Sequence, residues 1–320
     1  MLHPPQFWRH DGLLPRLLSP LSAITAGVTA HRIARPGWRA PVPVICCGNV
    51  TVGGAGKTTL ALDLGQRLIA RGRTVHFLLR GYGGRKRGPH RVAVGDTADE
   101  VGDEALLLTA VAPTWIGGDR ATSARAAVAA GAQVLVMDDG LQNPTLHKDL
   151  SLLVVDGASG FGNGRILPAG PLREPIAVAA ARCQAAVLIG PEVKLPPSLP
   201  VLRASLVPGP EAVNLAGKAV LAFAGIAMPD KFFAMLRGAG INLADAVPFP
   251  DHYPYTEKDI LRLMRAARNV ALLVTTPKDA VRLPPAMRSN VQVVGVTLAW
   301  TDPSALEALL EQIACADHDG

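Results

Sequence analysis

A glycine-rich loop that ends in Lys57-Thr58 is the segment of this sequence whose residue types and spacing point most directly to chemistry. It follows a short apolar run, 43–47, and precedes a helical pattern, 60–68, which is the strand–loop–helix context that a phosphate-binding P-loop requires. Glycines let backbone N–H groups converge on phosphate oxygens, and the helix N-terminus adds the positive end of its dipole. We therefore expect ATP here, with Lys57 on the β- and γ-phosphates and Thr58 on Mg²⁺. The residues expected to line the nucleotide are Thr51, Val52, Gly53, Gly54, Ala55, Gly56, Lys57, Thr58 and Thr59.

Two positions of this loop depart from common patterns. The usual P-loop has Gly where this chain has Thr51, although Gly53, Gly54 and Gly56 keep the loop permissive. A related class of ATPases carries a second lysine just before the Gly-Gly pair, and Val52 in that place argues against the dimeric partitioning and targeting ATPases. The alternative, a glycine-rich turn with a chance Lys-Thr, leaves the flanking strand and helix unexplained.

A second apolar run, 133–137, ends in Asp138-Asp139 and continues into Gly140-Leu141-Gln142. An acid at the carboxyl end of a parallel strand lies beside the phosphate site, where it can hold Mg²⁺ directly or through water. A lone aspartate after a strand more commonly caps a helix, but two in succession favour a metal site. We therefore expect Asp138 and Asp139 beside the P-loop.

Composition restricts the class of protein and of partner. The 320 residues are 49% hydrophobic and 18% charged, which excludes a disordered polyelectrolyte, and four Cys form neither a disulfide framework nor a metal motif and fit a reducing cytoplasm. The net charge of +6 is concentrated: residues 1–41 hold five Arg and one Asp, and residues 71–91 hold seven Lys and Arg and no acid. Such islands favour an anionic partner, either a membrane or a phosphorylated molecule, while 4% aromatic residues argue against nucleic acid.

The N-terminal forty residues contain apolar side chains spaced to share one helical face: Leu13, Leu14, Leu17, Leu18, Leu21, Ile24 and Val28. The stretch without charge, 17–30, is too short to span a bilayer and contains Pro20. Two interpretations stay open. The helix lies in a membrane interface with its arginines at anionic head groups, or it packs against its own domain.

The order of elements predicts an α/β fold with a P-loop NTPase-like parallel sheet. Strands are expected near 43–47, 74–79, 133–138 and 151–155, with helices near 57–71, 104–111 and 120–130. After a Pro-rich tract at 191–200 come strands near 201–206, 219–224, 271–275 and 292–297, with helices near 229–238, 256–268 and 303–314. We divide the chain into an N-terminal amphipathic helix at 1–41, a P-loop kinase domain at 42–190 and a smaller α/β lobe at 201–320 that closes the active-site cleft.

Several motifs in succession make the chain resemble the tetraacyldisaccharide 4′-kinases, the lipid A 4′-kinases of Gram-negative bacteria. The resemblance spans nearly the whole chain, and Thr51 is itself usual for that family. Pro277 stands where the family has Glu. The matching segments are Gly48-Asn49 through Thr58, Arg80-Gly81-Tyr82-Gly83, Gly102-Asp103-Glu104, Gly117-Gly118-Asp119-Arg120, Asp138 to Gln142, Gly164 to Pro175, Phe249-Pro250-Asp251-His252 and Thr275-Thr276-Pro277-Lys278-Asp279.

The resemblance implies transfer of the ATP γ-phosphoryl group to the 4′-hydroxyl of a tetraacyldisaccharide 1-phosphate, at the cytoplasmic face of the bacterial inner membrane. It implies that Asp103 is the base and that His252 orients it. It also implies that Asp138, Asp139, Gln142 and Glu174 arrange Mg²⁺ together with Thr58. The resemblance further makes Arg173 and Arg120 candidate charge stabilisers, beside Lys57.

Each role has a structural alternative. Asp103 also fits the N-cap of a helix that begins at Glu104. His252 fits an exposed loop histidine, Arg173-Glu174 a solvated ion pair, and the basic segment 80–91 either a solvated charge run or a mobile loop that closes over phosphates. Two other functions stay open: a P-loop kinase of a soluble phosphorylated metabolite, and a nucleotide-switch ATPase.

Overall fold

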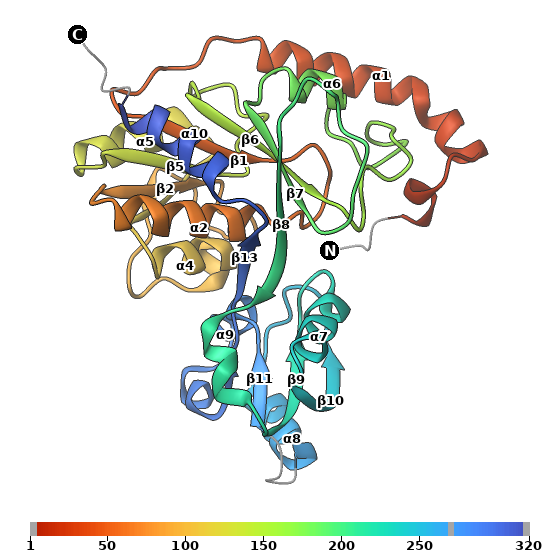
Figure 1. Cartoon of the computed structure of the whole chain (residues 1–320), viewed down its shortest axis with the longest axis vertical. Helices are drawn as coiled ribbons and strands as arrows, with labels where there is room; N and C mark the ends of the chain where they lie inside the picture. The colour runs from red at the N-terminus through yellow and green to blue at the C-terminus, as the bar shows by residue number, and fades with distance from the viewer. Residues whose placement is uncertain (1–4, 268–271, 316–320) are drawn as a thin grey trace.

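A nine-stranded sheet forms the larger of two α/β lobes (Figure 1). The computed structural model describes residues 5–267 and 272–315. The five residues of β1 and of its neighbour β5 are all buried, as expected for apolar runs in the middle of a parallel sheet. Only the two edge strands, β13 and β3, pair antiparallel. In spatial order the strands are β13 (Val296–Trp300), β8 (Val201–Pro208), β7 (Ala185–Ile189), β6 (Leu150–Asp156), β1 (Val44–Gly48), β5 (Val134–Asp138), β2 (Val75–Leu79), β4 (Thr114–Ile116) and β3 (His90–Arg91).

Helices cover both faces of this sheet and bury two separate apolar layers. One layer is covered by α2 (Lys57–Ala70), α4 (Asp103–Thr109) and α10 (Ser304–Cys315). The other is covered by α5 (Arg120–Ala129) and α6 (Ile176–Ala180), while the short α3 (Ala98–Val101) precedes α4. The predicted doubly covered parallel sheet is therefore confirmed. Cys46 and Cys47 in β1 are fully buried.

The smaller lobe is built on a four-stranded parallel sheet (Figure 1). Its core includes an aromatic cluster in which Phe223, Phe249 and Tyr255 meet edge to face. In spatial order the strands are β10 (Asn242–Pro248), β9 (Ala219–Ala224), β11 (Leu272–Thr275) and β12 (Gln292–Val293). The helices are α7 (Pro229–Gly238), α8 (Glu257–Ala267) and α9 (Pro277–Ala280), with 3₁₀ turns η2 (Pro210–Leu215) and η3 (Pro285–Asn290).

The boundary between the lobes differs from the one expected at 191–200. Strand β8 pairs with β7 in the large sheet, and β13 pairs with β8. Leu306 and Leu310 of α10 are fully buried in the apolar layer that also contains Leu64. The smaller sheet therefore involves only residues between β8 and β13, and these two strands form both connections between the lobes (Figure 1). The predicted strand at 292–297 is in fact two strands, β12 and β13, which belong to different sheets.

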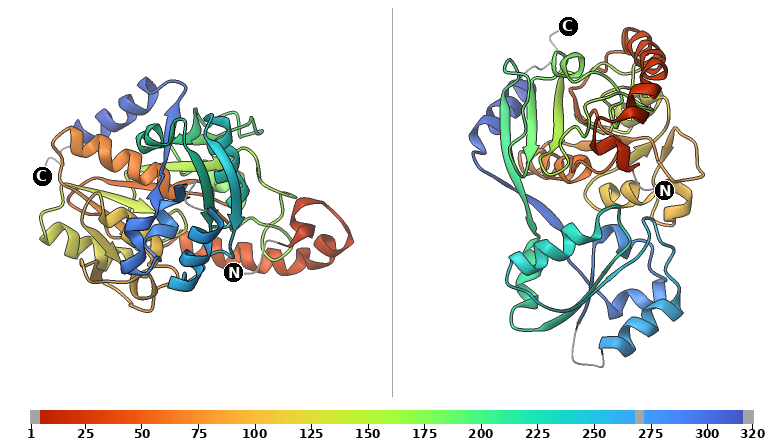
Figure 2. Two further views of the ribbon diagram at one scale, coloured as in Figure 1. Left: turned by 90° about the horizontal axis from the view of Figure 1, so that it is seen from below. Right: turned by 90° about the vertical axis from the view of Figure 1, so that its right-hand side faces the viewer.

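The N-terminal helix α1 (Leu13–Ile33) lies against the large lobe, on the side away from the smaller lobe (Figures 1 and 2). Hydrogen bonds hold this N-terminal region on the lobe: the Ser22 hydroxyl of α1 donates to the Ile166 carbonyl at 2.7 Å, and Trp8 Nε1, in the preceding η1 (Gln6–Arg9), donates to the Pro168 carbonyl at 3.1 Å.

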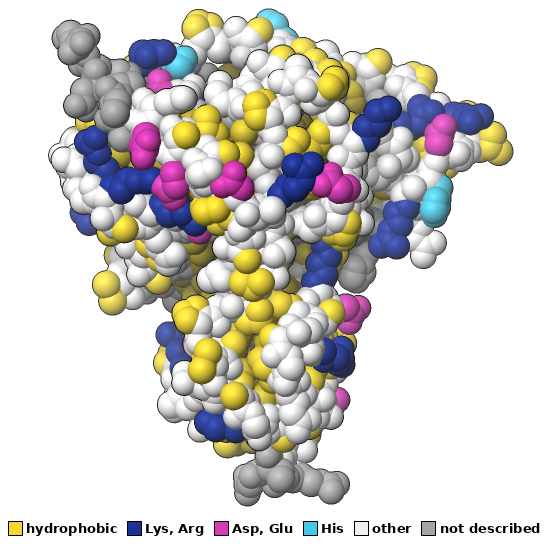
Figure 3. Space-filling model, viewed as in Figure 1, with side chains coloured by type: hydrophobic (Ala, Val, Ile, Leu, Met, Phe, Trp, Pro, Cys, Tyr) yellow, Lys and Arg dark blue, Asp and Glu magenta, His cyan; other side chains and the backbone are white. Residues whose placement is uncertain are grey.

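The apolar residues of α1 face solvent. Leu13, Leu14, Leu17, Leu21, Ile24 and Val28 are 49–80% exposed. In Figure 3, yellow hydrophobic and dark blue basic side chains both lie at the end of the molecule where Figure 1 draws α1. The helix is long and apolar enough to cross a membrane by length and composition alone. These side chains therefore face away from the lobe, whereas Leu18, the seventh apolar residue of the expected face, is partly buried.

Replacement of Leu306 by Ala tests the assignment of α10 to the large lobe. Because Leu306 is fully buried, we expect Leu306→Ala to lower the free energy of unfolding by about 2–5 kcal/mol, measured by chemical denaturation. Leu261→Ala on α8 is the control, because that side chain is 41% exposed, and it should change the free energy by less than about 0.5 kcal/mol. Equal stability of the Leu306→Ala and parent proteins would contradict the packing described here.

Candidate active site

The P-loop links the end of β1 to the first residue of α2, Lys57. Gly56 precedes the helix with φ 87°, a left-handed conformation, and a Cβ there would lie 2.6 Å from Ile189 Cδ1. Only glycine satisfies both constraints. At the other end of the loop, Asn49 Nδ2 donates to the Thr51 carbonyl at 2.9 Å and lies 3.2 Å from the Thr51 hydroxyl. The residue that replaces the usual glycine is thus held in place by Asn49.

Two oxygen atoms from residues that directly follow β1 and β5 hold Lys57 inside this loop. Its Nζ donates to Asn49 Oδ1 at 3.2 Å and lies 3.8 Å from Asp139 Oδ1. The ammonium group therefore stands between the loop that follows β1 and the acid that follows β5. This is the position from which a lysine can reach phosphate oxygens bound by the loop.

Asp138, at the end of β5, carries the strongest sign of a cation site. The Thr58 hydroxyl donates to its Oδ2 at 2.8 Å, the residue is 1% exposed, and Oδ1 has no hydrogen-bond partner among the described residues. Burial, followed by the charge of Glu104, raises the pKa of Asp138 to about 7, although Lys57 opposes the shift. A buried carboxylate oxygen without a partner fits a site for Mg²⁺.

Within the described ranges, no cluster of three or more His, Cys, Asp or Glu surrounds a single point. Mg²⁺ is usually bound by one or two carboxylates together with phosphates and water. Thr58 and Asp138 would supply the protein ligands nearest to the loop.

Asp139 faces Arg173 instead. The Arg173 Nη1 donates to both Asp139 oxygens, at 2.9 and 3.1 Å. Burial alone would raise the pKa of Asp139, but Lys57 and Arg173 together hold it below its ordinary value. Arg173 is therefore part of the site rather than half of a solvated pair with Glu174.

Gln142 and Glu174 form the next layer behind Asp139. Gln142 Nε2 donates to the Asn49 carbonyl at 2.9 Å and to Glu174 Oε1 at 2.8 Å. Glu174 is 1% exposed and also forms an ion pair with Arg182. These contacts orient both expected metal residues beside the site. Whether they reach Mg²⁺ stays a prediction.

Asp103 and His252 meet across the two lobes. The His252 Nδ1 lies 2.8 Å from Asp103 Oδ2, although 149 positions separate them in the sequence. The left-handed backbone of His252, with φ 58°, is fixed by donation of its N–H to the Gly225 carbonyl at 3.0 Å. Asp103 is the first residue of α4, Gly102 precedes the helix, and no side-chain cap is present. The helix-cap interpretation of Asp103 is therefore wrong.

The charge state of Asp103 follows from these neighbours. Burial alone would raise its pKa, but the hydrogen bond from His252 and the charges of Arg282, His252 and Lys278 hold the pKa below its ordinary value. The carboxyl group is accordingly ionised at neutral pH. An ionised, oriented carboxylate is what a proton acceptor for a hydroxyl group requires.

Two small-lobe cations at this position were not predicted as site residues. Arg282 Nε lies 3.3 Å from Asp103 Oδ2, and Lys278 Nζ donates to Glu104 Oε1 at 3.1 Å. Lys278 belongs to the motif 275–279 that the sequence does display. Arg282 lies three residues after the end of that motif, and no local pattern points to it. Pro277 is the first residue of α9, where a missing N–H costs no hydrogen bond.

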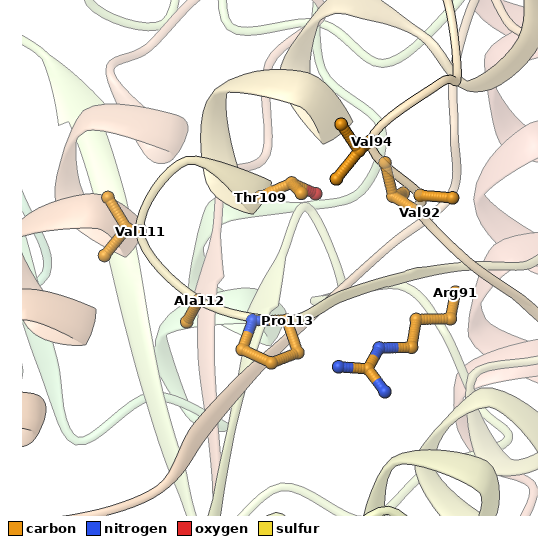
Figure 4. A pocket seen from close by; sticks show the side chains of 8 residues that line it. Arg91, Val92, Val94, Thr109, Val111, Ala112 and Pro113 are labelled. Carbon is orange, nitrogen blue, oxygen red and sulfur yellow. The ribbon is translucent and has the colours of Figure 1, made fainter.

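Two predicted features lie apart from these contacts. Arg120 is buried, donates to the Gly117 carbonyl and forms no ion pair with the described residues, although its charge acts on Asp139. Burial lowers the pKa of Arg120 to about 10. In the basic segment 80–91, Lys86 forms ion pairs with Asp96 and Glu100. A shallow hollow lies further along this segment, at the outer edge of the large sheet, and Figure 4 shows that most of its lining side chains are apolar.

A P-loop after a central strand of a parallel sheet, a buried acid beside its Thr, and a carboxylate–histidine pair that bridges the two lobes define a P-loop phosphotransferase. Similarity to known proteins identifies the family. The chain belongs to the tetraacyldisaccharide 4′-kinases, since the family model for tetraacyldisaccharide-1-P 4′-kinase matches residues 14–314.

Individual relatives agree with this assignment. The tetraacyldisaccharide 4′-kinase of Gluconacetobacter diazotrophicus is 60% identical over 319 residues, covering 97% of this chain and 98% of that protein. The enzyme of the same name from Gluconobacter oxydans is 53% identical, with 98% of each chain covered. The crystal structure of LpxK from Aquifex aeolicus in complex with ATP superposes with a TM-score of 0.77 at 26% identity, covering 94% of this chain and 99% of that one. The chain is thus an ATP-dependent kinase.

Replacement of Lys57 by Ala tests the P-loop directly. Loss of one preorganised positive donor at the transferring phosphate should lower kcat by about 10²–10³-fold without unfolding the protein. Turnover of labelled ATP and the thermal unfolding temperature are the two measurements. Lys194→Ala, at an exposed lysine in the loop between β7 and β8, should keep parent turnover. A folded Lys57→Ala protein with parent kcat would remove Lys57 from the mechanism.

Proposed function

We propose that the chain moves the γ-phosphoryl group of ATP to the 4′-hydroxyl of tetraacyldisaccharide 1-phosphate, with Asp103 as the base. The observation that carries the proposal is the buried, ionised Asp103, whose Oδ2 contacts His252 and Arg282 of the smaller lobe while Oδ1 accepts no hydrogen bond from the described residues. The charge of Glu104 acts on Asp138, so the N-terminus of α4 lies within electrostatic range of the P-loop site.

In the proposed step, each bond that forms or breaks and the transferred proton involve ATP, the acceptor hydroxyl and Asp103. The acceptor oxygen forms the bond to the γ-phosphorus as the bond to the β–γ bridging oxygen breaks, and ADP leaves. The hydroxyl proton passes to Asp103 Oδ1. Such a reaction needs alignment and charge neutralisation more than covalent help from the protein.

The remaining residues bind and orient. The backbone of residues 51–59 and Lys57 hold the phosphates, and Arg173 supports Asp139 beside them. Mg²⁺, when bound by Thr58 and Asp138, would neutralise charge on the phosphate oxygens. Asp139, Gln142 and Glu174 would arrange its waters.

A lipid acceptor is supported by the exposed apolar residues of α1. A kinase of a soluble phosphorylated metabolite leaves that face unused, and a nucleotide-switch ATPase has no need of the Asp103–His252 pair. We propose that α1 lies in the cytoplasmic interface of the bacterial inner membrane, with its apolar side chains among the acyl chains and Arg16 and Arg32 at the head groups.

Asp103→Asn and His252→Ala test the base. Each should lower kcat by about 10²–10⁴-fold in an assay with labelled ATP, Mg²⁺ and detergent-dispersed tetraacyldisaccharide 1-phosphate, read as label in the lipid extract. Asp99→Asn on α3 is a matched control, because Asp99 is exposed and its side chain forms no ion pair with the described part of the chain. Near-normal labelling by a folded Asp103→Asn protein would contradict the assignment of Asp103 as the base. Hydrolysis of ATP without lipid labelling in the parent protein would favour the switch ATPase.

The membrane proposal is tested by charge on the apolar face of α1. We expect the parent protein to sediment with anionic liposomes and the double variant Leu17→Glu, Ile24→Glu to remain in the supernatant, because two charges oppose insertion of that face. Deletion of residues 1–40 should have the same effect. Val213→Glu, at a 76% exposed apolar residue of the smaller lobe, should sediment like the parent. Unchanged sedimentation of the α1 variants would refute the proposal.

A further inference from the structure

Arg282, in the turn that follows α9, is the second small-lobe side chain that contacts the carboxyl group of Asp103. Its side chain is 5% exposed, and its Nε lies 3.3 Å from Asp103 Oδ2, the same oxygen that His252 Nδ1 contacts. Both small-lobe groups therefore act on one oxygen of Asp103. The other oxygen, Oδ1, is left without a partner from the described part of the chain.

The guanidinium of Arg282 is fixed by the smaller lobe itself. Its Nη2 donates to Asp279 Oδ1 at 3.0 Å and to the Gly225 carbonyl at 2.9 Å, and its Nη1 donates to the Tyr253 carbonyl at 3.2 Å. The Nε–H donates to the Lys278 carbonyl at 3.0 Å, so the contact with Asp103 is an ion pair rather than a hydrogen bond. Lysine, with one ammonium group, cannot make this set of contacts at once.

Asp279 and Gly225 anchor this arrangement. Asp279 is fully buried and accepts hydrogen bonds from the Tyr255 hydroxyl and the Gly225 N–H, both at 2.8 Å. The Gly225 carbonyl accepts from the His252 N–H as well as from Arg282. The two groups that contact Asp103 thus share one backbone support.

We propose that Arg282 is a positioning residue for Asp103: together with His252 it occupies Oδ2 and leaves Oδ1 turned to the acceptor hydroxyl. The proposal rests on the role of Asp103 as the base. Two contacts on one oxygen restrict rotation of the carboxyl group, which a single hydrogen bond leaves less defined. Because both contacts come from the smaller lobe, the carboxylate is aligned only while that lobe is seated against α4.

The charges around Asp103 determine how the pH dependence changes when Arg282 is removed. Those from the smaller lobe are His252 with Asp251 at 3.8 Å, Arg282 with Asp279, and Lys278, which pairs with Glu104 of α4. Arg282 is one of the groups that hold the pKa of Asp103 low. Its removal raises that pKa, so the base is protonated at a higher pH and the acid limb of kcat/KM moves upward in pH.

The test compares Arg282→Gln, Arg282→Lys and Asp103→Asn in the lipid-labelling assay across pH. We expect Arg282→Gln to lower kcat by about 10–100-fold, leave KM for ATP unchanged and shift the acid limb upward. Arg282→Lys should keep the acid limb but lose part of kcat, because a charge remains while the fork is lost. Arg262→Gln, at a small-lobe arginine whose side chain is 68% exposed, should behave like the parent.

The double variant Asp103→Asn, Arg282→Gln separates positioning from a structural role. If Arg282 acts through Asp103, the double variant is no slower than Asp103→Asn alone. A further loss of kcat in a double variant that folds as well as Asp103→Asn overturns the proposal. So does a folded Arg282→Gln protein with parent kcat, or with lower kcat and an unmoved acid limb. If thermal unfolding shows that Arg282→Gln does not fold, Arg282→Lys decides, and parent kcat in that variant overturns the proposal.

Failure of the base assignment is distinguishable from failure of this inference. Parent turnover in a folded Asp103→Asn protein removes the base itself. Loss of turnover in Asp103→Asn, with parent behaviour in Arg282→Gln, keeps the base and removes only the role of Arg282.

Discussion

Burial of carboxyl groups beside the P-loop is the constraint that organises this molecule. Asp103, Asp138 and Glu174 are almost fully buried, and an unpaired buried charge costs several kcal/mol. Each is compensated differently. Asp103 contacts His252 and Arg282 of the smaller lobe, and Glu174 is paired with Arg182. Asp138 has a raised pKa and one oxygen without a partner among the described residues. The distribution of cations therefore distinguishes the acid that we propose as a metal ligand from the acid that we propose as the base.

The segment 163–174 connects the N-terminal helix with the phosphate site. Near its start, Arg165 Nε lies 2.8 Å from Asp11 Oδ1, and Ser22 bonds to the Ile166 carbonyl. Near its end, the Val52 N–H donates to the Pro171 carbonyl at 2.9 Å, and the N–H of Arg173 donates to the Val50 carbonyl at 2.6 Å. The segment 163–174 therefore fixes the distance between the P-loop and the apolar face of α1. With α1 in a membrane interface, as we propose, this distance would set how far the phosphate donor lies from the bilayer.

The sequence predicts which segments form strands, because apolar periodicity determines that. It does not predict which neighbouring strand each one pairs with. Apolar runs such as 43–47 and 133–137 are long enough and apolar enough to predict buried parallel strands, and both lie in the middle of the large sheet. The strands after the Pro-rich tract look alike in sequence, yet β8 and β13 join the large sheet while β9 and β11 form the small one. A strand pattern carries no information about which hydrogen-bonding neighbour lies beside it, so the lobe boundary was placed incorrectly.

The same distinction applies to the site. The P-loop is contiguous, so its geometry follows from local residue types, and the pairing of Asp103 with His252 followed from a family resemblance rather than from spacing. Neither a local residue pattern nor the family resemblance pointed to Arg282. Its importance arises because α9 and the loop that carries His252 both pack around Gly225, which brings its guanidinium to a carboxylate 179 positions earlier in the chain. A lone arginine in a sequence is most often a solvated surface residue, and only its burial against Asp279 and Asp103 distinguishes this one. Residues that position a catalytic group from another lobe are therefore the class that sequence patterns identify last.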